Sequence, residues 1–144
     1  MNITFTALKP EHSAIVPHLR KTDLDEIKLL SGLSPDMAIA YSIAVSEKGY
    51  AVFCDGELCS VFGVSGGVIW LVGSDTISEH PIAFYRLSRP FFLNLRKGYK
   101  RLENFVDARN FLSLRWLKWL GFDVQPFGFL NGIQIFHAKW EEAA

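Results

Sequence analysis

The most strongly apolar helix pattern of the chain lies within residues 105–122. The segment opens as a short apolar strand, turns through polar residues and continues as a helix with only three polar side chains between its caps. Asn110 can cap the start of this helix, because its side-chain oxygen accepts from free N–H groups of the first turn. Gly121 can end it in the left-handed conformation. The apolar residues cover too wide an arc for a helix with one solvent-exposed face. We therefore expect the helix to be buried on two sides, or to be buried on one side and to contact a partner on the other.

The first third of the chain predicts a strand followed by helices. Apolar and polar residues alternate over 3–8, which is typical of a strand. Pro10 can begin a helix that Pro17 keeps short. Thr22 and Ser34 are N-cap candidates for two further helices, because acidic residues follow each of them. The second of these helices has a predicted apolar face made of Met37, Tyr41, Ala44 and Val45.

A β-rich section follows. The runs 50–54 and 58–64 are joined by Asp55-Gly56, the dipeptide that a type I′ hairpin prefers. After a Gly-Gly turn, residues 68–72 form a nearly continuous apolar run. Such a run predicts a central strand that is covered on both faces.

The remaining segments complete an α/β pattern. They predict a helix over 78–97, with a kink or break at Pro90, and a strand over 101–106. The last two strands are expected around a turn at Pro126 and Gly128. This order of elements predicts one domain of all 144 residues, an α/β (α+β) fold with a mixed sheet.

Composition narrows the class of protein. A hydrophobic content of 49% argues against disorder. No apolar run is long enough to cross a bilayer, and the N-terminal residues lack the pattern of a signal peptide, so we expect a cytoplasmic protein. The four histidines show no metal-ligand spacing, so no metal is expected.

The two cysteines flank the predicted hairpin turn. Two-residue hairpin pairing would place Cys59 opposite Val52 rather than opposite Cys54. We therefore expect both cysteines to be reduced thiols in the core.

The formal net charge is zero but unevenly distributed. Residues 1–75 carry five basic and nine acidic side chains, and residues 76–144 carry ten and six. This asymmetry either steers an anionic ligand or partner, or reflects a solvated helix face. Arg86 and Arg89 make the predicted 78–97 helix basic, but zero net charge and the lack of a known motif argue against nucleic-acid binding.

Two parts of the chain carry a resemblance. The Asn110 cap, with a helix that ends in Leu120-Gly121-Phe122, resembles the C-terminal signature of GNAT-type N-acetyltransferases. The runs 106–110 and 116–122 are more specifically similar to a bacteriophage family of small GNAT-like proteins, related to the internal virion protein A of short-tailed phages. The resemblance implies a GNAT-like acyltransferase fold, with a mixed, mostly antiparallel sheet and helices on both faces.

The resemblance also implies where a catalytic site would lie. GNAT enzymes hold the pyrophosphate of coenzyme A in a glycine-rich loop after the fourth strand. The equivalent segment here, 72–80, has one glycine, and its acidic residues Asp75 and Glu79 would repel a diphosphate. The weak cofactor-binding candidates are Val72, Gly73, Ser74 and Asn110.

The proton donor is changed as well. In the GNAT register, the tyrosine that protonates the leaving thiolate falls at Leu117, which cannot donate a proton. Tyr85 and Tyr99 are the remaining catalytic candidates, unless both are aromatic core residues. The fourth and fifth strands of a GNAT fold separate at one end. If side chains plug the gap between them here, Trp70 and Phe105 are the residues expected to do so.

Further candidates concern binding. Asp107 and Arg109 lie at a strand end beside a helix start, where they either recognise a ligand or partner, or brace the turn. The candidate contact residues for a protein partner are Trp116, Trp119, Arg86 and Arg89.

Three hypotheses for function follow. The first is a non-catalytic, virion-associated protein without a cofactor, which is present in the host cytoplasm during infection and in the virion, and binds phage virion or host proteins or a second copy of itself. The second is an acetyl-CoA-dependent N-acetyltransferase that modifies a host or phage protein. The third is an inhibitor of a host enzyme that acts through the basic helix.

Overall fold

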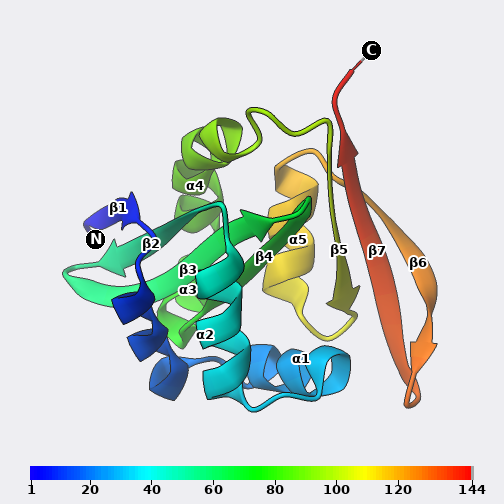
Figure 1. Cartoon of the computed structure of the whole chain (residues 1–144). Coiled ribbons are helices and arrows are strands. Elements are labelled where there is room, and N and C mark those ends of the chain that lie inside the picture. The colour runs from blue at the N-terminus through cyan, green and yellow to red at the C-terminus, as the bar shows by residue number, and fades with distance from the viewer. Residues whose placement is uncertain (144) are drawn as a thin grey trace.

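The centre of the molecule is one seven-stranded sheet, and the computed structural model describes residues 1–143. Its strands are β1 (Ile3–Ala7), β2 (Lys48–Cys54), β3 (Glu57–Ser65), β4 (Val68–Gly73), β5 (Arg101–Asp107), β6 (Asp123–Leu130) and β7 (Ile133–Glu141). Their order across the sheet is β1-β2-β3-β4-β5-β7-β6, and only β4 and β5 are parallel (Figure 1). The predicted mixed, mostly antiparallel sheet is confirmed.

Helices cover both faces of the sheet, as expected (Figure 1). One face carries the 3-10 helix η1 (Pro10–His18), α1 (Lys21–Ser31) and α2 (Pro35–Val45). The other carries α3 (Asp75–Glu79), α4 (Pro81–Leu95) and α5 (Phe111–Trp119).

Each layer of helices packs on its own side chains of the sheet. On the first face, Ile15 and Ile39 pack with Val61. On the second face, Phe62 and the Trp116 ring make an edge-to-face contact, with ring centroids 5.4 Å apart. The central strand β4 contributes buried residues to both layers. This confirms the prediction that its continuous apolar run is a strand covered on both faces.

The caps of α5 form as predicted. Asn110 Oδ1 accepts from the Ser113 N–H at 3.4 Å. At the other end, Gly121 has a φ of 98°, and the Phe122 N–H donates to the Leu117 carbonyl at 3.0 Å. This is the bond pattern of a Schellman motif, which satisfies carbonyls that the helix leaves free.

The helix α2 starts as predicted but faces the other way. Ser34 Oγ caps it by accepting from the Met37 N–H at 3.2 Å. The predicted core face is wrong, however, because Met37 and Tyr41 are 61% and 64% exposed, while Ile39 and Ile43 are buried. Since α2 is apolar on nearly all sides, its periodicity does not identify the buried face.

The predicted 78–97 helix is two helices. The break falls at His80, which has φ −132° and ψ 54°, and α4 then runs through Pro90 to Leu95. The helix therefore does not break at Pro90. The physical reason is Pro81, since a proline disfavours the helical conformation in the residue before it.

The last hairpin also differs from the prediction. Pro126 and Gly128 lie inside β6, where the register with β7 shifts, and do not form the turn. The chain reverses at Asn131-Gly132, with φ values of 49° and 76°. Both central residues of a type I′ turn need positive φ, which Asn-Gly adopts readily.

The β2–β3 hairpin has the predicted turn but not the predicted register. Asp55-Gly56 has positive φ at both residues. A bulge after Val52 places Ser60 opposite Val52 and leaves Cys59 as the extra residue. Cys54 and Cys59 then form a disulfide, with Cα atoms 6.0 Å apart. The expectation of two reduced thiols is wrong, because it assumed regular pairing without a bulge.

Candidate functional site

The parallel pair β4 and β5 separates toward its carboxyl end. The strands are in register only at Val68 and Glu103, where the Glu103 N–H also donates to the Gly67 carbonyl at 2.8 Å. Beyond that point α5 appears in the space between them (Figure 1). The carboxyl ends of strands in α/β sheets are where such folds bind ligands. We call the space between the two strands the splay.

Side chains fill the splay. The cavity that remains has a volume of about 10 Å³ and is lined by Glu26, Trp70, Asn104, Trp116 and Leu117 among others. A space of this size holds at most about one water molecule. Trp70 therefore belongs to the expected plug.

The second expected plug residue lies elsewhere. Phe105 is 38% exposed, and its ring contacts Phe127 and His137 at centroid distances of 4.8 and 4.9 Å. Successive residues of a strand point to opposite faces, so Phe105 points away from the buried Val106. Trp116 and Leu117 from α5 take the place expected of it.

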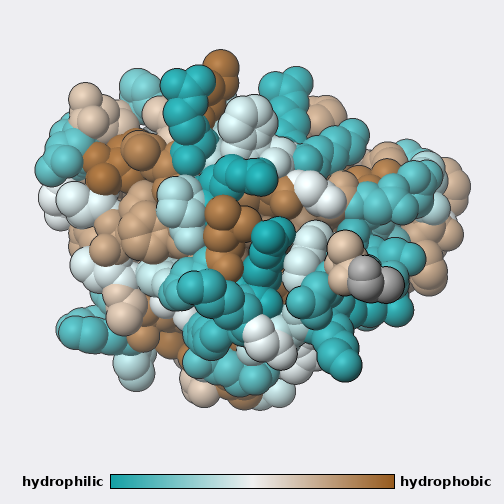
Figure 2. Space-filling model, turned by 90° about the horizontal axis from the view of Figure 1, so that it is seen from above, coloured by the Kyte–Doolittle hydropathy of each residue, from teal (hydrophilic) through white to brown (hydrophobic). Residues whose placement is uncertain are grey.

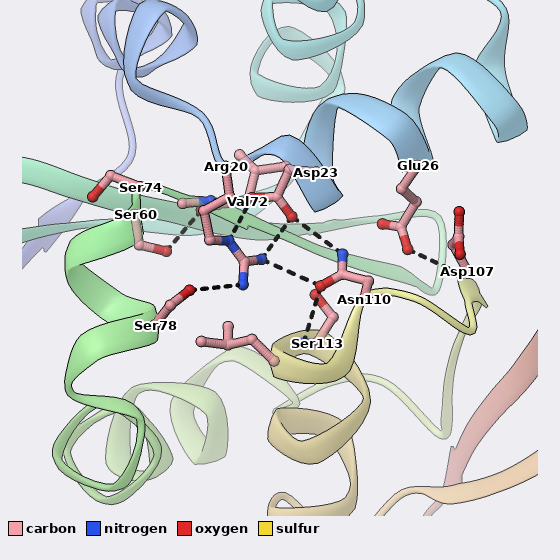
Figure 3. A network of polar contacts seen from close by, with 12 residues as sticks. Arg20, Asp23, Glu26, Ser60, Val72, Ser74, Ser78, Asp107, Asn110 and Ser113 are labelled. Atoms are coloured by element: carbon pink, nitrogen blue, oxygen red, sulfur yellow. Dashed lines mark hydrogen bonds and ion pairs between the residues drawn. The ribbon is translucent and has the colours of Figure 1, made fainter.

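The start of α1 closes the open end of the splay (Figure 3). Asp23 accepts from the backbone N–H of Gly73 at 2.8 Å, from Arg20 Nη2 at 2.7 Å and from Asn110 Nδ2 at 3.1 Å. Arg20 is its bidentate partner, because Nε also donates to Asp23 at 3.1 Å. Arg20 is 4% exposed and Asp23 is fully buried. The end of β4 is thus bonded to α1 and, through Asn110, to α5.

The end of β5 is bonded to the same helix. Glu26 Oε2 accepts from the Asp107 N–H at 3.0 Å. Arg20, Asp23 and Glu26 follow one another at intervals of three residues, which places them along one side of a helix. We call these three residues and their contacts the α1 bridge.

Burial controls the ionisation of the α1 bridge. Burial raises the pKa of Asp23 above its ordinary value, while Arg20 acts in the opposite direction. Burial, helped by the nearby charges of Asp23 and Asp107, also raises the pKa of Glu26 from 4.5 to about 8. The Asp107 N–H opposes this rise. Glu26 therefore carries a proton near neutral pH.

The cofactor-binding candidates are used for structure. Gly73 has its N–H bonded to Asp23 and its carbonyl to the Arg20 N–H at 3.0 Å. Ser74 donates from its N–H to the Cys59 carbonyl at 2.9 Å, and the Val72 carbonyl accepts from a β3 hydroxyl at 2.8 Å. Asp23 links Asn110 to one of the other three candidates, Gly73, because it accepts hydrogen bonds from both.

The residues at the splay do not fit coenzyme A. A diphosphate would need free N–H groups at the end of β4, but the Gly73 N–H already donates to a carboxylate. The Asp23 carboxylate lies at the end of β4, where it accepts from this N–H, and it would repel the phosphates. A cavity of about 10 Å³ also leaves no room for a thioester chain.

The tyrosine candidates lie outside the splay lining. The Tyr85 hydroxyl donates to the Leu112 carbonyl at 3.2 Å. The Tyr99 hydroxyl donates to Glu47 Oε2 at 3.0 Å, on another part of the molecule. Leu117 itself is 3% exposed and lines the closed splay.

The Asp107–Arg109 pair forms a brace of the turn before α5. Arg109 Nη2 and Nε reach Asp107 Oδ2 at 2.7 and 3.2 Å, and the Arg109 N–H donates to Oδ1 at 2.8 Å. Asp107 is 1% exposed, whereas the Arg109 side chain is 44% exposed. The guanidinium thus retains an open side.

The contact candidates divide into core and surface. Trp116 is 1% exposed and donates from Nε1 to Ser88 Oγ at 2.9 Å, so its expected role in a contact surface is wrong. Trp119 is 47% exposed, and Arg89 Nη1 donates to its carbonyl at 3.2 Å. Arg86 is exposed on α4. Seen from above, the molecule mixes hydrophilic residues with hydrophobic patches (Figure 2).

An apolar groove lies beside the β6–β7 hairpin. It has a volume of about 510 Å³ and is lined by Leu30, Phe105, Phe127, Phe129 and Leu130 among others. Phe127 and Phe129 are 69% and 74% exposed. We call this surface the β6–β7 groove; no pattern in the sequence had indicated it, because its residues come from α1, β5, β6 and β7.

Residues 1–143 contain neither a cluster of metal ligands nor a helix suited to span a membrane. No group of three or more His, Cys, Asp or Glu side chains is placed to hold a metal ion within this range. In the same residues, no helix has the length and apolar character needed to span a membrane.

Comparisons with sequences give no match. No model of a known protein family matches the chain. No curated protein matches it either.

Solved structures match over nearly the whole chain. A GNAT-family acetyltransferase from Streptococcus pneumoniae has a TM-score of 0.64 at 13% identity, covering 99% of this chain and 100% of that one. An N-acetyltransferase from Staphylococcus aureus has a TM-score of 0.61 at 14% identity, covering 98% and 99%. AAC(6′)-Ib in complex with ribostamycin and coenzyme A has a TM-score of 0.64 at 12% identity, covering 98% and 94%. The chain thus has the fold of the GNAT acetyltransferases.

Proposed function

We propose that this chain is a non-catalytic GNAT-fold protein that acts by binding another protein. The observation that supports the proposal is the α1 bridge. Asp23 and Glu26 accept from the strand-end N–H groups of Gly73 and Asp107. In this way the chain supplies its own partners at the place where a cofactor would otherwise bind.

The groups that acetyl transfer would need also support a non-catalytic role. Leu117 occupies the position of the proton donor and is buried. The hydroxyls of Tyr85 and Tyr99 are bonded to Leu112 and Glu47. Neither tyrosine is thus directed at the splay.

The β6–β7 groove is the surface that we assign to the partner. Exposed aromatic side chains are enriched where proteins bind one another, and a groove of about 510 Å³ can hold several side chains of a partner. The resemblance of residues 106–110 and 116–122 to internal virion proteins of short-tailed phages supports a phage particle as the setting.

Calorimetric titration with acetyl-CoA tests the absence of a cofactor. We expect no saturable heat in the micromolar range. Saturable micromolar binding would contradict a splay closed by α1. Mass spectrometry of purified phage particles tests the setting: the chain should be present in them, and its absence would remove the virion role.

The alternative is an acetyl-CoA-dependent N-acetyltransferase that modifies a host or phage protein. It is favoured by the likeness to AAC(6′)-Ib, which was solved with coenzyme A. Glu26 lies at the splay with a pKa raised to about 8, so the fraction of it that is ionised could accept a proton from an amine. Acetylated lysines or N-termini that appear in infected cells only with the intact chain would favour this alternative.

A further inference from the structure

The Cys54–Cys59 disulfide lies at a pocket between η1, the β2–β3 hairpin and the start of α3. This pocket has a volume of about 430 Å³, and we call it the cysteine pocket. Its lining includes Cys54, Cys59, Ala14, His18, Glu57 and Thr76. A small molecule that enters the cysteine pocket would therefore contact the disulfide.

Hydrogen bonds hold the hairpin on both sides of the disulfide. The Asp55 N–H donates to the Asn2 carbonyl at 2.7 Å, and the Asn2 N–H donates to Asp55 Oδ1 at 2.8 Å. The Cys59 carbonyl accepts from the Ser74 N–H at 2.9 Å. A disulfide between residues so close in sequence also constrains the unfolded chain less than one that closes a long loop. We therefore expect the fold to persist when the disulfide is reduced.

The two cysteines differ in their access to solvent. Cys54 is 6% exposed, whereas Cys59, the extra residue of the β-bulge, is 1% exposed. A thiolate breaks a disulfide by attacking one of its sulfurs, and the other sulfur then leaves. Because access affects which sulfur is attacked, Cys54 Sγ is the expected target and Cys59 Sγ is the expected leaving group.

The charge of the lining favours one class of thiol. Among the described residues, the lining contains one carboxylate, that of the exposed Glu57, and no lysine or arginine. This carboxylate would attract a thiol that carries an ammonium group and repel a thiol that carries a carboxylate. The neutral imidazole of His18, in the same lining, can accept the proton of the incoming thiol.

We propose that Cys54–Cys59 is a reactive disulfide that exchanges with a small aminothiol. The sulfur of the aminothiol bonds to Cys54 Sγ, the bond between Cys54 and Cys59 breaks, and Cys59 Sγ takes up the proton that the incoming thiol has lost. The product is a mixed disulfide on Cys54 and a free thiol on Cys59. A second aminothiol that attacks this mixed disulfide leaves both cysteines reduced and forms a symmetric disulfide with the first, so two small thiols are oxidised for each protein disulfide that is reduced. This inference goes beyond the proposed function, because it requires neither a protein partner nor acetyl-CoA.

Cysteamine, a small aminothiol, is the probe that tests the proposal. The air-oxidised chain is mixed with cysteamine, the reaction is stopped with N-ethylmaleimide, and the peptides are mapped by mass spectrometry. We expect cysteamine on Cys54 and maleimide on Cys59. At equal thiolate concentration, 3-mercaptopropionate should react at least about threefold more slowly, because Glu57 repels its carboxylate.

Two tryptophan variants test whether the thiol enters through the cysteine pocket. Ala14→Trp should slow the reaction with cysteamine by about tenfold, because its ring would fill the pocket and limit access to Cys54. Ala40→Trp is the matched control: it adds the same ring at an exposed alanine of α2 outside the lining, and the rate should stay unchanged.

Five outcomes would overturn the proposal. Maleimide on both cysteines before cysteamine is added would mean that the disulfide does not form. Cysteamine mainly on Cys59 would contradict the assigned target. Equal rates for the two tryptophan variants would mean that the thiol does not enter through the pocket, and equal rates for the two thiols would remove the aminothiol class. Loss of the circular dichroism spectrum of the folded chain on reduction would make the disulfide a structural bond. None of these outcomes concerns acetyl-CoA, so the proposed function stands or falls separately.

Discussion

The splay and the β6–β7 groove are two openings of the same sheet, and they differ in what fills them. The splay retains about 10 Å³, and its strand ends bond to side chains of α1. The groove retains about 510 Å³ and exposes Phe127 and Phe129. The chain's own side chains fill the splay, whereas the β6–β7 groove stays open and can contact another molecule.

The comparison shows how a fold can lose one binding site while keeping another. Asp23 joins Arg20, Gly73 and Asn110, so these polar groups of the closed splay find their partners within the chain. The groove lacks such internal partners, and exposed aromatic area is stabilised when another surface covers it. Three substitutions test this contrast.

Asp23→Ala should have the largest effect. It would leave the buried Arg20 guanidinium without its carboxylate and the Gly73 N–H without its acceptor. Breaking a buried ion pair by removing one partner destabilises by about 3–5 kcal/mol. Urea denaturation followed by fluorescence measures the loss. The matched control is Asp25→Ala on the same helix, where the exposed Lys21 pair predicts a far smaller change. A loss below about 1 kcal/mol for Asp23→Ala would mean that water reaches the α1 bridge.

Glu26→Gln should alter how stability depends on pH. Folding raises the pKa of Glu26 from 4.5 to about 8, so the folded chain holds a proton that the unfolded chain has released between these values. Stability should therefore fall as pH rises from 4.5 to about 8, by up to about 1.4 kcal/mol per pH unit.

The glutamine variant keeps an acceptor for the Asp107 N–H but does not titrate. Its stability should fall less steeply over this range, and above about pH 8 it should exceed that of the unchanged chain. Urea denaturation at a series of pH values gives both curves. Parallel curves for the two chains would show that Glu26 titrates normally.

Phe129→Ser, in the β6–β7 groove, should have the smallest effect on folding. The side chain is 74% exposed, so the free energy of unfolding should change by no more than about 0.5 kcal/mol. Thermal denaturation measures this. A large loss of stability would mean that the groove is part of the core, and the contrast with the splay would no longer hold.

Local features of this fold were predictable from the sequence. The Asn110 cap, the Gly121 C-terminus and the Asp55-Gly56 turn depend on residues that are close along the chain. The Asn131-Gly132 turn carried an equally local signal and could have been found in place of Pro126 and Gly128. The proline effect at His80 belongs to the same class.

The α1 bridge was not predictable in this way. Arg20, Asp23 and Glu26 read as ordinary polar residues at the start of a helix, and only the folded structure brings Gly73 and Asp107 to them. The disulfide was missed for a related reason, since a bulge in the hairpin decides whether Cys59 meets Cys54.

The α1 bridge also sets an order of events in folding. Arg20 and Asp23 are three residues apart and can pair as soon as α1 forms, but their other bonds reach Gly73 and Asn110, up to 90 residues away. Contacts between distant residues form slowly, because the chain must first close a long loop. During synthesis, the α1 bridge can be completed only after Asn110 has been made, so we expect its bonds to β4 and α5 to form late in folding.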